Sequence, residues 1–254
     1  MYLQIQRKGR ENTDKMKVLI IIPAYNEEEN ILNTCKTIEN YSEKYDYIVI
    51  NDGSKDNTEK ILTQNNINHI QLVKNLGIGG AVQTGYKYAF EHNYDIAVQF
   101  DGDGQHDIRY VKTICEPIAS GEADMCIGTR YLNQDTSEFK STFMRRFGKN
   151  IISAVIKICC KKRITDPTSG FRAVNREIIE IFSQNYPTEY PEPDSTVNIL
   201  LSGYKVKELP VNMMERKNGK SSINVWKSAD YMIKVTLSII INKIGTKKRK
   251  EKIK

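Results

Sequence analysis

The first half of the chain alternates short apolar runs with longer segments of mixed polarity. The apolar runs lie at 17–22, 47–51, 69–73, 95–100 and 123–128. The segments between them have the length of helices and lie at about 26–40, 55–66, 79–92 and 107–120. Strands that are apolar at every position are typical of a parallel sheet covered on both faces. The pattern therefore predicts an α/β fold with a mostly parallel central sheet flanked by helices.

The second half has a different pattern. Residues 143–160 place apolar side chains at helical spacing, which predicts an amphipathic helix. A proline-rich stretch, YPTEYPEPD at 186–194, is expected to form a loop, and a strand is expected at 204–211. A last helix is predicted at about 225–241. No apolar run approaches the roughly 20 residues that a membrane-spanning helix needs. A membrane-spanning helix is therefore not expected.

Polar clusters follow the first four predicted strands. Their sequences are PAYNEEEN, NDGSKDNT, KNLGIGG and DGDGQHD, in chain order. In open α/β sheets, ligands bind beyond the carboxyl ends of the strands. We therefore expect these four clusters to meet at one edge of the sheet and to form a ligand site there.

The cluster after the fourth strand has the composition of a metal site. Asp101 and Asp103 are two residues apart, so on an extended chain they point to the same side, and Gln105 continues the series. Oxygen ligands of this kind suit Mg²⁺ or Mn²⁺, which leave positions open for phosphate oxygens. An acidic surface turn is the alternative interpretation.

Charge and cysteine content narrow the class of protein. The net charge is +7, but the last twelve residues alone, 243–254, hold seven Lys or Arg and one Glu. A basic tail on a nearly neutral body favours a local contact with an anionic surface over nucleic-acid binding. The five cysteines are an odd set without a CxxC pair, which predicts a reducing, cytoplasmic compartment.

Six motifs in order give the chain a recognisable signature. They are IIPAYNEEENI, VINDGSKDNT, NLGIGGAVQTGYKYA, FDGDGQHD, GTRY and DPTSGFR. In sequence and spacing they resemble the family 2 glycosyltransferases of the GT-A fold, a Rossmann-like nucleotide-diphospho-sugar transferase fold. Within that family the similarity is greatest to the dolichyl-phosphate mannose synthase and polyprenyl-phosphate sugar synthase branch. The resemblance covers about residues 17–223.

The resemblance implies roles for residues of the first five motifs. Asp103 and Gln105 resemble metal ligands for Mg²⁺ or Mn²⁺, and Arg130 resembles an arginine that neutralises phosphate during catalysis. The residues implied in nucleotide-sugar binding are Pro23, Ala24, Tyr25, Glu27, Asp52, Gly80, Asp101, Gly102 and Asp103.

Several of these residues also have structural interpretations. Asp52 suits a turn and the N-cap of a helix that starts near Lys55. The glycine-rich loop before 79–92 lacks the GxGxxG spacing of a dinucleotide site, so tight helix packing is the alternative for Gly80. Arg130 has the alternative of an ordinary surface cation.

DPTSGFR resembles the acceptor-side loop of the lipid-phosphate branch, and the resemblance implies an acidic base in the segment after it. Ser169 and Arg172 are predicted to hold an acceptor phosphate, and the alternative is that the motif shapes a turn while Arg172 pairs with an acid. Glu192 and Asp194 are candidates for a catalytic base. A hydroxyl acceptor needs such a base, whereas a lipid phosphate is already ionised. The family inverts the anomeric centre in a single displacement.

These inferences give an expected organisation and function. Residues 1–16 are expected to be a loose extension, 17–224 the glycosyltransferase domain, and 225–254 an amphipathic helix with a basic tail. The protein is expected to move a hexose from a nucleotide sugar to a lipid-linked acceptor, polyprenyl phosphate or a growing glycan. It would sit peripherally at the inner face of the membrane, through contact with anionic lipid. A catalytically idle nucleotide-sugar binding or partner-recruiting protein is the alternative.

Overall fold

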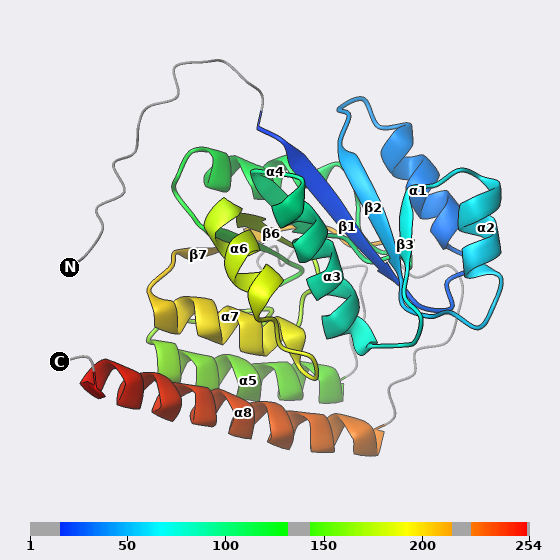
Figure 1. Ribbon diagram of the computed structural model, residues 1–254. Helices are drawn as coiled ribbons and strands as arrows, with labels where there is room; N and C mark the ends of the chain where they lie inside the picture. The colour runs from blue at the N-terminus through cyan, green and yellow to red at the C-terminus, as the bar shows by residue number, and fades with distance from the viewer. Residues whose placement is uncertain (1–15, 132–142, 215–224, 253–254) are drawn as a thin grey trace.

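A seven-stranded sheet forms the centre of the molecule (Figure 1). The computed structural model describes residues 16–131, 143–214 and 225–252, with backbone alone for 143–147, 225–229 and 246–252. The strand order is β3-β2-β1-β4-β6-β5-β7. The strands are β1 Val18–Ala24, β2 Asp46–Asn51, β3 His69–Gln71, β4 Ile96–Gln99, β5 Met125–Thr129, β6 Arg172–Asn175 and β7 Val206–Pro210.

All strand pairs are parallel except the two that β6 forms with β4 and β5. The predicted mostly parallel α/β sheet is therefore confirmed, and the antiparallel β6 is an addition that the apolar pattern did not predict. β6 pairs along β4 so that Arg172 lies opposite Gln99. This register brings the DPTSGFR segment beside the end of β4.

Helices cover both faces of the sheet. They are α1 Ile31–Glu39, α2 Thr58–Gln64, α3 Gly77–Glu91, α4 Tyr110–Ala119, α5 Phe143–Cys160, α6 Arg176–Gln184, α7 Pro191–Ser202 and α8 Val225–Lys252. Alternate residues of β1 face opposite sides because successive strand side chains alternate: Leu19 and Ile21 join the core under α3 and α6, while Ile20 and Ile22 join the core under α1 and α4. Burial on both faces explains why β1 is apolar throughout.

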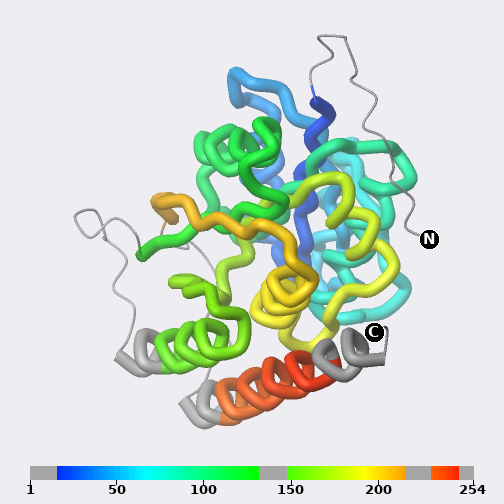
Figure 2. Tube along the Cα trace, turned by 90° about the vertical axis from the view of Figure 1, so that its left-hand side faces the viewer, coloured from blue at the N-terminus to red at the C-terminus, as the bar shows by residue number. Residues whose placement is uncertain are grey.

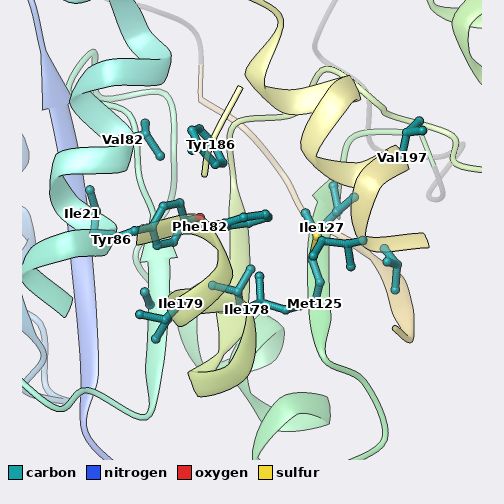
Figure 3. Packing of buried hydrophobic residues seen from close by; sticks show 14 of the residues in the cluster. Ile21, Val82, Tyr86, Met125, Ile127, Ile178, Ile179, Phe182, Tyr186 and Val197 are labelled. Atoms are coloured by element: carbon teal, nitrogen blue, oxygen red, sulfur yellow. The ribbon is translucent and has the colours of Figure 1, made fainter. Parts of the chain in front are cut away.

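Aromatic rings fill the core between α3 and the segment that leads to α7. Tyr86 of α3 has its ring centroid 5.1 Å from that of Phe182 and 5.4 Å from that of Tyr186 (Figure 3). Close packing also explains two glycines of α3, Gly79 and Gly85. A Cβ on Gly79 would lie 2.3 Å from the backbone oxygen of Pro187, and a Cβ on Gly85 would lie 2.2 Å from Cγ2 of Ile21. The glycines of this segment therefore allow α3 to pack closely against its neighbours.

The proline-rich segment YPTEYPEPD does not form a loop throughout, so that prediction was wrong in part. α7 begins at Pro191, and Glu192 and Asp194 lie in its first turn. The backbone N–H groups in the first turn of a helix have no hydrogen-bond partner within the helix, so proline is tolerated there. Acidic residues in this turn interact favourably with the helix dipole. The base candidates are therefore part of a helix.

α8 packs against α5 and α7 at one side of the molecule, where the three helices lie side by side (Figures 1 and 2). Val235 and Ile239 of α8 are fully buried, as is Ile156 of α5. α5 confirms the predicted amphipathic helix, whereas α8 continues past 241 to Lys252. Among the described residues, no helix has the length and apolar content to cross a membrane. The expected extension, apart from Met16, and the tail side chains from 246 onward lie outside the residues that are described.

Candidate active site

A cavity of about 450 Å³ opens at the carboxyl edge of the sheet, where the sequence predicted a ligand site. Its walls come from the segments after β1, β2, β3 and β4. Eight of the nine residues expected to bind a nucleotide sugar line it: Pro23, Ala24, Tyr25, Glu27, Asp52, Asp101, Gly102 and Asp103. The ninth, Gly80, lies within α3 and is not part of the lining. Asn75 and Ile78 line the cavity as well; the sequence placed their segment, KNLGIGG, at this edge but did not single out these two residues.

Asp52 joins two walls of this cavity. One of its carboxylate oxygens, Oδ1, accepts a hydrogen bond of 2.7 Å from the backbone N–H of Leu76. Burial raises the pKa of Asp52, and the backbone bonds from Leu76 and Gly77 oppose that rise. The N-cap interpretation is wrong, because α2 begins only at Thr58 with Asn57 as its N-cap. Asp52 instead fixes the loop after β3 against the end of β2.

The turn after β4 presents its acids to the cavity. Gly104 adopts a positive φ of 75°, which bends the backbone, and the N–H of Gln105 donates to Oδ1 of Asp103 at 3.1 Å. A Cβ on Gly102 would lie 3.2 Å from the backbone oxygen of Pro23, so the turn lies close against β1. Asp101 forms its own contacts with His106.

The predicted metal ligands, Asp103 and Gln105, are both partly exposed. Only Asp103 is among the residues that line the cavity. Within the described residues there is no group of three or more acidic, histidine or cysteine side chains that would enclose a metal on its own. Two protein oxygens fit a hard cation that takes its remaining ligands from phosphate and water, which is the usual manner of Mg²⁺. The residues present therefore fit a metal that is bound together with a diphosphate.

Arg130 is anchored by a buried acid. Its Nε lies 3.1 Å from Oδ2 of Asp166, and its side chain is 21% exposed, whereas that of Asp166 is fully buried. A second contact of 3.3 Å joins its terminal nitrogen to Oδ1 of the same carboxylate. Burial lowers the pKa of Arg130, but the carboxylates of Asp166 and Asp101 outweigh this and raise it. Arg130 is thus a held cation near Asp101, and the surface-cation interpretation is wrong.

The pairing of Arg130 with Asp166 was not predicted. From the sequence, Asp166 was interpreted only as part of a turn formed by DPTSGFR. The two partners are 36 positions apart in the chain. Lys149 of α5 extends the positive region, because its Nζ lies 3.3 Å from the centroid of the Tyr131 ring, next to Arg130. No pattern in the sequence connects these residues.

The two predicted acceptor residues are buried and bonded within the protein. Ser169 is 1% exposed and donates from Oγ to the backbone oxygen of Gly128 at 2.6 Å. Arg172 is fully buried and donates to the backbone oxygens of Ser169 and Glu192 and to the Ser195 hydroxyl. These bonds tie β6 to the first turn of α7. A role of either residue in acceptor binding stays a prediction.

The two base candidates face different parts of the protein. Oδ2 of Asp194 accepts a hydrogen bond of 2.6 Å from the Ser238 hydroxyl of α8. Glu192 lies instead near Arg172 and Asp101: burial raises its pKa, Arg172 lowers it and Asp101 raises it further. The structure therefore brings Glu192, and not Asp194, toward the acids of the cavity.

Comparison with known proteins agrees with this architecture. The profile described as Glycosyl transferase family 2 matches residues 19–182. The UDP-N-acetylglucosamine--dolichyl-phosphate N-acetylglucosaminyltransferase of Methanococcus voltae is 33% identical over 219 residues, which cover 78% of this chain and 85% of that protein. The polyprenol monophosphomannose synthase of Mycolicibacterium smegmatis is 25% identical over 231 residues, covering 86% and 85%.

Solved structures match at the level of the fold. The glucosyl-3-phosphoglycerate synthase of Mycobacterium tuberculosis, in complex with Mn²⁺, UDP-glucose and phosphoglyceric acid, aligns with a TM-score of 0.65 at 17% identity, covering 90% of this chain and 80% of that one. The GT-A fold expected from the motifs is confirmed, as is the resemblance to the polyprenyl-phosphate branch. The chain belongs to glycosyl transferase family 2 and is a glycosyltransferase.

Proposed function

We propose that this enzyme transfers a sugar from a nucleoside diphosphate sugar to a polyprenyl phosphate. The observation that carries the proposal is the cavity at the carboxyl edge of the sheet, which eight of the residues expected to bind the donor line together. The named activities of the relatives from Methanococcus voltae and Mycolicibacterium smegmatis support the choice of acceptor.

The donor would lie along the cavity with its nucleoside between β1 and β2. Tyr25 is 41% exposed at the rim and offers a ring face, while Asp52 offers a carboxylate to the ribose or the base. Asp101 and Asp103 then lie at the diphosphate end. Asp103 and Gln105 would hold Mg²⁺ or Mn²⁺, which supplies charge neutralisation for the leaving diphosphate when it is bound.

Arg130 would stabilise the negative charge that develops on the leaving diphosphate. Because Asp166 holds two of its nitrogens, the guanidinium is oriented before the donor binds. Preorganised charges of this kind act without reorganisation during the reaction. The acceptor would attack from the opposite face of the sugar and invert the anomeric centre.

An exposed apolar row on α8 supports a peripheral position at the membrane. Ile233, Leu237 and Ile241 are 62%, 53% and 65% exposed, on a helix whose other side is buried against α5 and α7. An apolar helix face of this kind can lie in a lipid interface. The lysine-rich tail would add attraction to anionic headgroups, which in the cytoplasm means the inner face of the membrane.

A hydroxyl acceptor on a lipid-linked glycan is the second candidate, and Glu192 is the observation that favours it. The pKa of its carboxyl is raised by burial, and it lies near Asp101. A carboxylate with a raised pKa suits a general base, which a hydroxyl needs and an ionised phosphate does not. A replacement of Glu192 therefore separates the two candidates.

The test combines donor binding with an acceptor panel. A thermal-shift panel of nucleotides and nucleotide sugars, with and without Mn²⁺, first identifies the donor, because a ligand that binds only the folded state raises the melting temperature. Transfer is then measured to polyprenyl phosphate and to polyprenol-linked glycans, with wild type and Glu192→Gln. We expect transfer to the phosphate at a rate that Glu192→Gln changes less than tenfold. Transfer to hydroxyls alone, lost in Glu192→Gln by about 10²-fold or more, would support the second candidate, and donor binding without any transfer would indicate an idle binding protein.

A further inference from the structure

His106 is a buried histidine next to the acids of the donor cavity, and neither donor nor metal binding has been assigned to it. It is 4% exposed and is not part of the cavity lining. Its ring lies 4.9 Å from that of Phe171 and 5.3 Å from that of Phe100, measured between centroids. The ring is therefore packed against two phenylalanine rings of the core.

Both nitrogens of His106 lie close to the same residue, Asp101. Nδ1 lies 3.0 Å from the backbone nitrogen of Asp101, and Nε2 lies 3.5 Å from its carboxylate oxygen Oδ2. A backbone N–H can only donate, so Nδ1 must accept, and the ring proton is then on Nε2. The protonated Nε2 then lies 3.5 Å from the Asp101 carboxylate, which is a close electrostatic contact and not a directed hydrogen bond. The imidazole therefore contacts the main chain and the side chain of one residue at once.

The acceptor-side segment confines the Asp101 carboxylate from a second direction. A Cβ on Gly170 would lie 2.8 Å from Oδ2 and 2.9 Å from Oδ1 of Asp101. Gly170 does not have a positive φ, so its backbone conformation does not call for glycine. The close approach of the Asp101 carboxylate is instead the reason for a glycine at this position. Phe171, the next residue, is one of the two rings that pack on His106. Asp101 is thus held between His106 and the DPTSGFR segment.

We propose that His106 is a positioning residue that fixes the carboxylate of Asp101 at the junction of the donor cavity and the acceptor-side segment. The proposal rests on the proposed function, because Asp101 is there a donor-binding residue. His106 acts through Asp101 and touches neither donor nor acceptor itself. Its loss should weaken donor binding, and a side chain that restores the acceptor at Nδ1 should restore part of that binding.

The first test reads the hydrogen bond directly and needs no substrate. In ¹⁵N-labelled protein, His106 should show an unprotonated Nδ1 and a protonated Nε2. A scalar coupling across the hydrogen bond should connect Nδ1 to the amide nitrogen of Asp101. A protonated Nδ1, or a missing coupling in a folded protein, would overturn the proposal whether or not the protein transfers a sugar.

The second test measures donor affinity by calorimetry in a matched set of variants. His106→Leu removes both contacts and should weaken nucleotide-sugar binding about tenfold, the usual effect of a lost hydrogen bond to a buried group. His106→Asn keeps an acceptor oxygen near the position of Nδ1 and should recover at least half of that loss on a logarithmic scale. His92→Leu, at an exposed histidine of the same protein, is the control and should bind as wild type does.

Gly170→Ala provides an independent displacement of the same carboxylate and does not touch His106. It should raise KM for the donor and lower kcat, while the His106 tautomer stays as in wild type. Equal donor affinity in wild type, His106→Leu and Gly170→Ala, each shown to be folded, would overturn the proposal. If wild type binds no nucleotide at all, the proposed function fails, and the tautomer and coupling still decide whether His106 fixes Asp101.

Discussion

The ion pair between Arg130 and Asp166 gives the sharpest test of how the catalytic edge is held together. Asp166→Asn removes the charge and keeps the shape of the side chain. The Asp166 side chain is fully buried, the Arg130 side chain is 21% exposed, and the shorter contact is 3.1 Å. At about 3 Å and an effective dielectric of about 20, two unit charges attract by roughly 5 kcal/mol. Loss of one partner of a buried pair costs about 3–5 kcal/mol, because the other charge stays buried.

Since Arg130 is partly exposed, we expect the lower end of that range, about 3 kcal/mol of unfolding free energy. For a protein of this size, 1 kcal/mol corresponds to about 2–4 °C in Tm, so Tm should fall by roughly 10 °C. Urea denaturation and calorimetry measure both values. The exposed pair of Lys207 and Glu122 is the control, and Glu122→Gln should leave the stability nearly unchanged.

Asp166→Asn should also lower kcat more than it weakens donor binding, because Arg130 would lose its orientation and keep its charge. We expect a loss in kcat of at least about tenfold, below the 10²–10³-fold that follows removal of a stabilising donor itself. A stability loss below about 1 kcal/mol together with an unchanged kcat would refute the view that this pair positions Arg130.

Three further predictions concern packing, pH dependence and metal. Gly79→Ala should destabilise the protein by about 1–3 kcal/mol, because its Cβ would meet the backbone of Pro187. In α8, the Cβ of Gly245→Ala would have no neighbour within 4 Å among the described residues, so this variant should be slightly more stable than wild type; urea denaturation compares the two. Burial raises the pKa of Asp194, so ionisation of this carboxyl lowers the free energy of unfolding as the pH rises through the folded-state pKa. Asp194→Asn should therefore be more stable than wild type at pH 7, and this difference in stability should vanish below about pH 4. A difference that grows in acid would contradict the prediction. EDTA should abolish transfer, and Mn²⁺ or Mg²⁺ should restore it, in a filtration assay of the labelled product.

The sequence was sufficient for the parallel strands of the sheet and for the edge where the site lies. Continuous apolar runs predicted the parallel strands, and the polar segments after them meet at the cavity, as the rule for open α/β sheets requires. β6 escaped prediction because only the two central residues of Arg172–Asn175 are apolar, and because it obtains its stability from pairing with β4 and β5, which are distant in the chain. The first turn of α7 was taken for part of a loop because YPTEYPEPD is rich in proline, although proline fits the first turn of a helix.

The supporting contacts of the site lay beyond the reach of the sequence for a related reason. The antiparallel strand β6 brings the DPTSGFR segment beside the end of β4. Only this arrangement allows Arg130 to contact Asp166 and places Asp101 against Gly170. A motif shows that such residues occur in order, but not which of them touch. Arg172 illustrates this, because its donors satisfy backbone oxygens inside the protein.

The most direct test of the central claim is a transfer assay with purified protein. The donor identified by thermal shift is supplied with a labelled sugar, together with Mn²⁺ and polyprenyl phosphate, and the label is followed into the organic phase. We predict a lipid product that mild acid releases, formed by wild type and by the control variant His92→Leu. Asp103→Asn should form this product at least about 10²-fold more slowly. Label that stays in the aqueous phase with wild type, or transfer that survives both Asp103→Asn and removal of metal, would contradict the account.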